Sequence, residues 1–171
     1  MSSCNFEELL GPTLLIGEGK EVYTKDLLKD KKYVMLYFSA QWCPPCRRFT
    51  PLLGEAYNAH KQYIQDNNHT TTTNKEEEEE DIEVIFISLD SLQSDFDTYR
   101  SKMPFYSIPF ANLWLLHLKD KLSAKYGIRS IPTLVILNGR DGTVLTKNGK
   151  GEYMNYFKGD YEVPSSYCCI S

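Results

Sequence analysis

The sequence of 171 residues lacks any long apolar run. No stretch approaches the ~18 consecutive apolar residues that a membrane-spanning helix requires. The first residues, Met1–Glu8, have neither the basic start nor the apolar run of a secretory signal. We therefore expect a cytoplasmic, reducing environment, in which the five cysteines are more often catalytic, metal-binding or lipid-modified than paired in structural disulfides.

An excess of basic residues is also absent. Lys and Arg number 19 against 23 Asp and Glu, a net charge of −4, so the composition gives no reason to expect a nucleic-acid partner. The low-complexity segment 66–81 contains four threonines followed by the acidic run Glu76–Asp81. Because this composition cannot bury apolar surface, we predict a disordered acidic loop inserted into one domain of residues 1–160, with a flexible tail at 161–171.

The apolar residues follow the pattern of an α/β domain. Residues 34–38 and 83–89 form continuous apolar runs rich in strand formers, as expected for strands buried on both faces. A helical period over 49–64 follows the first run, with His60 on its apolar face. Further elements are predicted as helices at 94–102 and 121–126, as strands at 133–137 and 143–146, and as a core-covering apolar run at 113–118. The order β-α-β-α-β-β predicts a central mixed sheet flanked by helices.

Two cysteines, Cys43 and Cys46, flank a pair of prolines where the first strand should pass into the first helix. Sulfurs at this spacing in a first helical turn can reach each other, so a disulfide can form and open with little backbone movement. Unpaired N–H groups and the helix dipole stabilise an anion at a helix N-terminus, which makes Cys43 the attacking thiolate. Cys46, one turn inside, is then the resolving thiol, and Pro44 and Pro45 stiffen the geometry.

The alternative interpretation of these two cysteines is half of a zinc site. Structural zinc takes four ligands, whereas this chain has a single C-x-x-C and no further His or Cys close to it in sequence. Recruitment of Cys168 and Cys169 as the missing ligands would strain the chain. We therefore favour redox chemistry, with no metal and no other cofactor.

Several motifs together carry a resemblance to a known family. Trp42–Arg47 follows an apolar strand, and Ser130–Thr133 follows later in the chain. This pattern is similar to that of the thioredoxin superfamily and, more narrowly, of its tryparedoxin and nucleoredoxin branch. The similarity extends from about Leu10 to Lys150. Its further motifs are Tyr37–Ala40, Phe49–Pro51, Lys102–Phe105, Ile108–Phe110 and Tyr126–Ile128.

The resemblance implies a thioredoxin-like fold and a substrate-binding surface around the cysteines. It implies that Ile131–Pro132 is a cis peptide facing the sulfurs, with neighbouring backbone that pairs with substrate. It also implies that Trp42, with Pro44 and Pro45, forms part of the same surface. The residues alone would not indicate the cis bond, because only ~5% of bonds before proline are cis in folded proteins.

The chain also departs from the family pattern at several positions. Thioredoxins proper carry a buried Asp at the position of Tyr37, and a Tyr there is usual for this branch. Tryparedoxins commonly have Trp at the positions of Leu89 and Phe105 and an Arg near Asn148. These differences weaken the expectation that trypanothione is the electron donor.

Two functions from different classes fit these features. We expect a monomeric enzyme that reduces disulfides in client proteins, peroxidases among them, with electrons from a low-molecular-weight thiol or a reductase. The alternative is an interaction module that binds partners and releases them when the cysteine pair is oxidised, with little turnover. An intact cysteine pair with a candidate cis-proline favours the enzyme.

The final residues predict a lipid attachment. Cys168–Ser171 fits the C-a-a-X prenylation pattern, and a terminal Ser favours farnesyl at Cys168. One lipid chain gives weak, reversible membrane binding, so we predict a protein divided between cytosol and membranes. Fractionation of cells that express the wild type or Cys168→Ser measures this division. Identical, wholly soluble behaviour of both, with a C-terminal mass that includes Ser171, would contradict the prediction.

Overall fold

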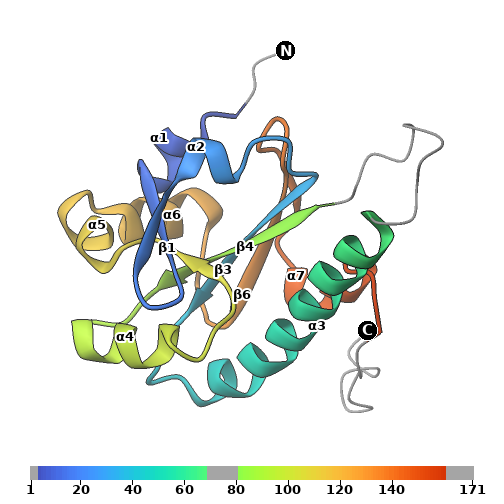
Figure 1. Cartoon of the computed structure of the whole chain (residues 1–171). Coiled ribbons are helices and arrows are strands. Elements are labelled where there is room, and N and C mark those ends of the chain that lie inside the picture. Colours follow the sequence, from blue (N-terminus) through green and yellow to red (C-terminus); the bar gives the residue numbers. More distant parts are fainter. Residues whose placement is uncertain (1–3, 69–80, 161–171) are drawn as a thin grey trace.

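Seven strands form one mixed sheet at the centre of the fold, with helices on both of its faces (Figure 1). The computed structural model describes residues 4–68 and 81–160. The strands are β1 Thr13–Ile16, β2 Lys20–Tyr23, β3 Tyr33–Ser39, β4 Ile82–Ser88, β5 Tyr106–Ser107, β6 Thr133–Asn138 and β7 Val144–Thr146. The helices are α1 Phe6–Leu10, α2 Thr24–Leu27, α3 Pro44–Asn68, α4 Gln93–Arg100, α5 Phe110–Leu115, α6 Leu118–Tyr126, α7 Gly149–Glu152 and the 3-10 turn Tyr153–Asn155. The predicted α/β class is confirmed.

Strand β3 lies between two partners in the order β2-β1-β5-β4-β3-β6-β7. It pairs in parallel with β4 along its whole length, and its other edge pairs antiparallel with β6. Strands β6 and β7 form the predicted antiparallel hairpin. The strands predicted at 34–38 and 83–89 are therefore confirmed as the centre of the sheet.

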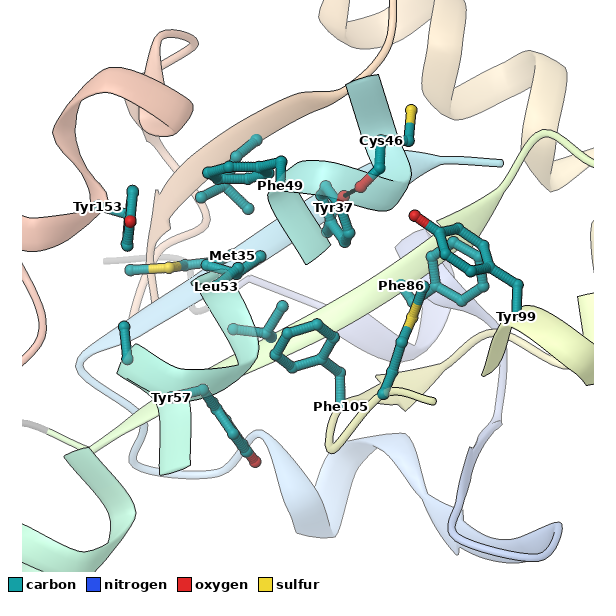
Figure 2. Close-up of a cluster of buried hydrophobic side chains, with 14 of the residues drawn as sticks. Met35, Tyr37, Cys46, Phe49, Leu53, Tyr57, Phe86, Tyr99, Phe105 and Tyr153 are labelled. Carbon is teal, nitrogen blue, oxygen red and sulfur yellow. Dashed lines mark hydrogen bonds between the residues drawn. The ribbon is translucent and has the colours of Figure 1, made fainter. Parts of the chain in front are cut away.

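Side chains of β3 alternate between two apolar cores. Met35 and Tyr37 point into the first core, which lies between the sheet and α3 (Figure 2). Val34, Leu36 and Phe38 point into the second core, on the face covered by α1, α5 and α6. Burial on both faces explains why β3 shows a continuous apolar run rather than an alternation of polar and apolar residues.

Several elements were not predicted from the apolar pattern. They are α1, a helix of five residues at the start of the described chain, and β5, whose two residues are too few to show an alternation. The helix predicted at 121–126 begins earlier, at Leu118, and ends as expected before Gly127, whose φ of 66° is left-handed. These additions leave the predicted central order of strands and helices intact.

The run 113–118 was predicted to cover the core, and this is wrong for part of it. Leu113 is buried, but the side chain of Leu115 is 78% exposed. Helix α5 ends at Leu115, and the chain then turns through His117, which has a φ of 52°, into α6. His60, in contrast, is buried and accepts a hydrogen bond from the backbone N–H of Lys158 at 3.0 Å, as a packed histidine should.

A cluster of charged side chains holds the start of β4 against α3. The Nζ atom of Lys61 lies 2.7 Å from Oδ1 of Asp81 and 2.6 Å from Oε1 of Glu83. Lys31 pairs with Asp81, and its Nζ atom lies 3.6 Å from Oε1 of Glu83. Tyr57 donates a hydrogen bond to Oε2 of Glu83 at 2.9 Å. Burial acts to raise the pKa of Asp81, but the hydrogen bonds and charges of the two lysines outweigh it and hold the pKa below its usual value.

Both ends of the segment predicted as an insert at 66–81 belong to other parts of the fold. Helix α3 continues through Asn68, and Asp81 belongs to the charged cluster. Residues 69–80, the tail 161–171 and the candidate lipid site Cys168 lie outside the described residues. Over the ranges 4–68 and 81–160, no helix is long and apolar enough to cross a membrane.

We predict that residues 69–80 are dispensable for folding. The charged cluster holds both flanking elements, and the free energy of loop closure changes by only about 0.6 kcal/mol per halving of loop length. Replacement of 69–80 by six glycine and serine residues is therefore expected to change the free energy of unfolding, measured in urea, by less than about 1 kcal/mol.

A matched control for this experiment removes one charge of the cluster. Lys61→Gln leaves Glu83, whose side chain is 4% exposed, with one cation fewer, so it is expected to lower the free energy of unfolding by more than the loop replacement does. Loss of cooperative unfolding on loop replacement would show that the segment is structural.

Candidate active site

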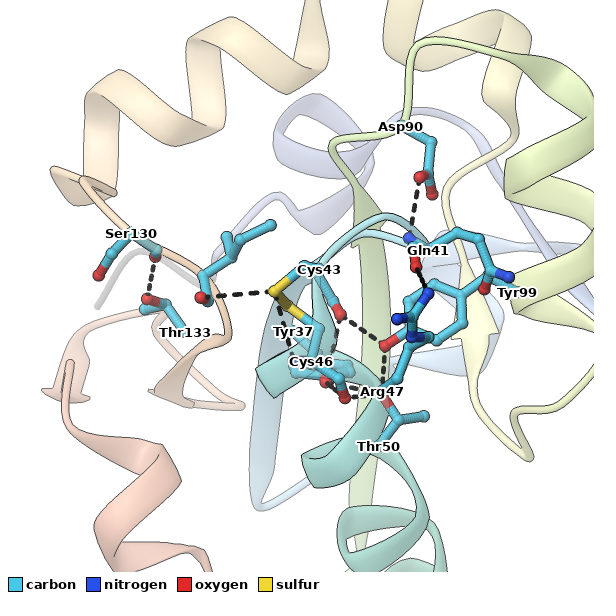
Figure 3. The surroundings of a disulfide bond; sticks show 12 residues. Tyr37, Gln41, Cys43, Cys46, Arg47, Thr50, Asp90, Tyr99, Ser130 and Thr133 are labelled. Atoms are coloured by element: carbon cyan, nitrogen blue, oxygen red, sulfur yellow. Dashed lines mark hydrogen bonds between the residues drawn. A yellow bond between two sulfur atoms is a disulfide. The ribbon is translucent and has the colours of Figure 1, made fainter.

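The two predicted cysteines lie where the end of β3 leads into α3 (Figure 3). Cys43 and Cys46 are joined by a disulfide, and their Cα atoms are 5.2 Å apart. Cys46 is completely buried, whereas Cys43 keeps 4% of its surface exposed. The small remaining exposure is thus at the cysteine that we expect to attack first.

The first turn of α3 presents a backbone donor to the sulfur of Cys43. Pro44 and Pro45 begin the helix and have no N–H group, so Cys46 is the first residue of α3 that can donate. Its N–H group lies 3.3 Å from Sγ of Cys43, and the next one, of Arg47, donates to the carbonyl of Cys43 at 3.1 Å. When the disulfide opens, the Cys46 N–H group and the helix dipole would stabilise a thiolate at Cys43.

The loop before β6 faces the disulfide from the other side (Figure 3). It contains the cis peptide bond between Ile131 and Pro132 that the family resemblance implied. The carbonyl oxygen of Ile131 lies 3.7 Å from Sγ of Cys43. The hydroxyl of Thr133 donates to the carbonyl of Ser130 at 2.6 Å and closes the loop on itself. The backbone acceptor beside the reacting sulfur is therefore held in place by the turn that contains the proline.

A buried carboxylate fixes the loop that carries Trp42. The indole of Trp42 is 60% exposed beside Cys43. The preceding residue, Gln41, donates its N–H to Oδ1 of Asp90 at 2.9 Å, and the hydroxyl of Ser88 donates to Oδ2 at 2.8 Å. Burial raises the pKa of Asp90, and these two hydrogen bonds partly offset the rise.

The sequence analysis missed Asp90, although a signal was present. Asp90 follows the buried strand β4, and β4 runs parallel to β3. The carboxyl ends of adjacent parallel strands meet at one edge of a sheet, so a polar residue directly after either strand is a candidate for the same site.

Four hydroxyl groups meet on the core side of the disulfide. They belong to Tyr37, Ser39, Thr50 and Tyr99. Burial raises the pKa of Tyr37, so this hydroxyl is neutral where thioredoxins proper carry an acid. The sequence analysis placed Tyr37, Ser39 and Thr50 in motifs of the family resemblance, but it gave none of the four residues a role at the site.

Among the described residues, the cysteine pair lies apart from any metal cluster and from the cavity described next. Within the part of the chain that the structure describes, no group of three or more His, Cys, Asp or Glu side chains is placed to hold a metal ion. A cavity of about 880 Å³ is lined by residues of α1, α2, the loop from α2 to β3 and the β6–β7 turn, including Lys29, Lys32 and Arg140. Since Lys32 directly precedes β3 and Cys43 follows its far end, this cavity is remote from the disulfide.

Proteins of known identity are similar to this chain in sequence. The family model described as thioredoxin-like matches residues 30–144. Tryparedoxin from Trypanosoma brucei brucei is 37% identical over 137 residues, which are 80% of this chain and 81% of that protein. Nucleoredoxin from Mus musculus is 33% identical over 150 residues, which are 88% of this chain and 30% of that protein, so the chain spans about a third of the nucleoredoxin.

A solved structure shares the fold as well. Native tryparedoxin I from Crithidia fasciculata is similar with a TM-score of 0.69 and 32% sequence identity, over 89% of this chain and 92% of that one. The cysteine pair, the cis-proline loop and strands β3 to β6 all lie within the matched residues 30–144. The chain therefore belongs to the thioredoxin-like family, and it is similar in sequence to tryparedoxins and nucleoredoxins and in fold to tryparedoxins.

Proposed function

We propose that this chain reduces protein disulfides, with Cys43 and Cys46 as its reacting groups. Its paired cysteines and its tryparedoxin and nucleoredoxin relatives support thiol–disulfide oxidoreductase activity. The observation that carries the proposal is the position of the Cys43 sulfur, between the N–H group of Cys46 and the carbonyl of Ile131. The donor stabilises a thiolate, and backbone next to a cis-proline can pair with an extended client.

The first half of the reaction takes place at Cys43. Its thiolate attacks the client disulfide, and a sulfur–sulfur bond forms between Cys43 and one client sulfur. The client's own sulfur–sulfur bond breaks, and its other sulfur leaves as a thiolate that takes up a proton.

The second half releases the client and closes the pair. The thiol of Cys46 loses its proton and attacks the sulfur of Cys43, and the second client sulfur leaves as a thiol. The client has then gained two electrons and two protons, and the protein carries the Cys43–Cys46 disulfide seen in the structure.

The surface around the pair suits a protein client. Trp42 and Leu92 are each 60% exposed. The hydrogen bond from Gln41 to Asp90 joins the two loops that carry them. Trp42, with Pro44 and Pro45, would contact client side chains, and the backbone beside Pro132 would pair with the client main chain. We expect client disulfides, those of peroxidases among them, to bind across this surface.

A low-molecular-weight thiol or a reductase would return the pair to the dithiol form. The solved structure of tryparedoxin II complexed with glutathionylspermidine is similar to this chain, with a TM-score of 0.66 and 30% identity over 84% of this chain and 85% of that one. Reduction of the purified protein by trypanothione, glutathione and thioredoxin reductase, measured side by side, would identify the class of donor.

The alternative function is a redox-sensitive interaction module with little turnover. Insulin reduction by the purified protein with dithiothreitol separates it from the enzyme. Multiple turnovers above the dithiothreitol background support the reductase, whereas partner binding that changes with the redox state, without turnover, supports the module.

We predict opposite effects for the two single-cysteine variants. Cys43→Ser is expected to abolish insulin reduction, because it removes the sulfur at the helix N-terminus. Cys46→Ser is expected to trap a mixed disulfide with the client, because no resolving thiol remains. Mass spectrometry under non-reducing conditions detects this adduct. Turnover of Cys46→Ser at the wild-type rate would rule out the two-cysteine mechanism.

A second prediction concerns the reduced protein without client. Iodoacetamide is expected to label Cys43 about tenfold faster than Cys46, which corresponds to about 1.4 kcal/mol of preferential stabilisation of one thiolate at the helix N-terminus. Limited labelling at several pH values, followed by peptide mass spectrometry, gives the two rates. Faster labelling of Cys46 would reverse the roles assigned to the two sulfurs.

A further inference from the structure

A closed ring of hydrogen-bonded hydroxyls lies on the core side of Cys46, and Figure 3 labels three of its members, Tyr37, Thr50 and Tyr99. Its members, called the hydroxyl ring below, are Tyr37 and Ser39 of β3, Thr50 of α3 and Tyr99 of α4. The oxygen–oxygen distances are 2.8 Å from Tyr37 to Thr50 and 2.5 Å from Thr50 to Tyr99. The ring closes with 2.8 Å from Tyr99 to Ser39 and 3.2 Å from Ser39 to Tyr37.

Thr50 attaches the hydroxyl ring to the active-site helix. Its hydroxyl donates to the carbonyl of Cys46 at 2.9 Å, and the hydroxyl of Tyr37 lies 3.5 Å from the same carbonyl. Each hydroxyl has one proton to donate. The four ring contacts and the Thr50–Cys46 contact together require one proton more than the ring has. Because Thr50 donates its proton to the Cys46 carbonyl, it accepts from the ring, and one ring contact lacks a proton at any moment.

The hydroxyl ring is buried and without charge. Tyr37 and Ser39 are fully buried, and Thr50 and Tyr99 nearly so. Burial raises the pKa of Tyr37, which keeps its proton. Because a buried polar group is costly to leave without a partner, a complete ring favours one arrangement of β3, α3 and α4 around Cys46.

The sulfur of Cys43 is supported by a different set of contacts. The N–H group of Cys43 donates to the carbonyl of Ala40 at 3.3 Å, and its sulfur contacts the carbonyl of Ile131 and the N–H of Cys46. None of these contacts includes a hydroxyl of the ring. The supports of the two cysteines are therefore separable by mutation.

We propose that the hydroxyl ring positions Cys46 for the second half of the reaction, in which it attacks the mixed disulfide. This inference rests on the proposed function and adds positioning residues to it. In that step a bond forms between the two protein sulfurs, the bond from Cys43 to the client sulfur breaks, and the departing thiolate gains the proton that Cys46 loses. The ring fixes the carbonyl of Cys46 and with it the distance and angle at which its sulfur approaches Cys43. The first half of the reaction does not depend on the ring.

The disulfide reagent 5,5′-dithiobis(2-nitrobenzoate) measures the two halves of the reaction separately. The reduced protein releases one thionitrobenzoate when Cys43 attacks and a second one when Cys46 resolves the adduct, and stopped-flow absorbance separates the two releases. Thr50→Val removes the shared hydroxyl and keeps a branched side chain of similar shape. It is expected to slow the second release by about three- to tenfold and leave the first unchanged.

Matched variants decide the outcome. Thr50→Ser keeps the hydroxyl and is expected to restore the second release. Ser39→Ala removes a ring proton from β3 without a change in α3, so it serves as a second test if Thr50→Val fails to fold. An unchanged second release, equal slowing of both releases, or equal loss in Thr50→Ser and Thr50→Val would overturn the proposal. A wild-type protein that releases a single thionitrobenzoate would overturn the two-cysteine function instead, so the two failures are distinguishable.

Discussion

The site depends on strand β3, which is hydrogen-bonded on both edges and buried on both faces. Its register aligns the ends of three strands. Ser39 lies opposite Ser88 of β4, and Phe38 lies opposite Thr133 of β6. Three loops therefore leave the sheet at the same end of its strands. They carry the cysteines, Asp90 and the cis-proline. A shift of one residue would exchange the two apolar faces of β3, so core packing also fixes the geometry of the site.

Different kinds of contact stabilise the two ends of the sheet. At the start of β4, lysines from α3 and from the residues before β3 neutralise Asp81 and Glu83. On the core side of the disulfide, the contacts to the first turn of α3 come from neutral hydroxyls. A helix dipole has its largest effect where few other charges act and water is excluded. The hydroxyls beside Cys46 thus add no charge of their own to the helix N-terminus that stabilises the Cys43 thiolate.

The structure also explains one position, Phe105, at which the chain differs from the family pattern. Phe105, at a position where tryparedoxins commonly have Trp, is 1% exposed and packs against Tyr57 with ring centroids 5.4 Å apart and against Tyr37 at 6.2 Å. Its side chain is part of the core, so this difference bears on packing and not on the choice of reductant. Leu89, which is half-buried after β4, stays closer to the surface that would meet a reductant.

Local sequence determined the parts of this protein that depend on neighbours in the chain. The continuous apolar runs fixed β3 and β4, the two prolines and the period after them fixed the start of α3, and the spacing of Cys43 and Cys46 fixed the reacting pair. The cis bond before Pro132 came from the family resemblance, because the residues alone favour trans. Elements too short to show a period, such as β5, could not be predicted.

Tertiary structure alone decided the contacts that tune the pair. Asp90 meets Gln41 across 49 residues, and Tyr99 meets Ser39 across 60. Each of these residues is ordinary in its own stretch of sequence, and each gains its role from a partner on another element. Hydrogen bonds reach only about 3 Å, so such partners exist only after the sheet has set the register of its strands.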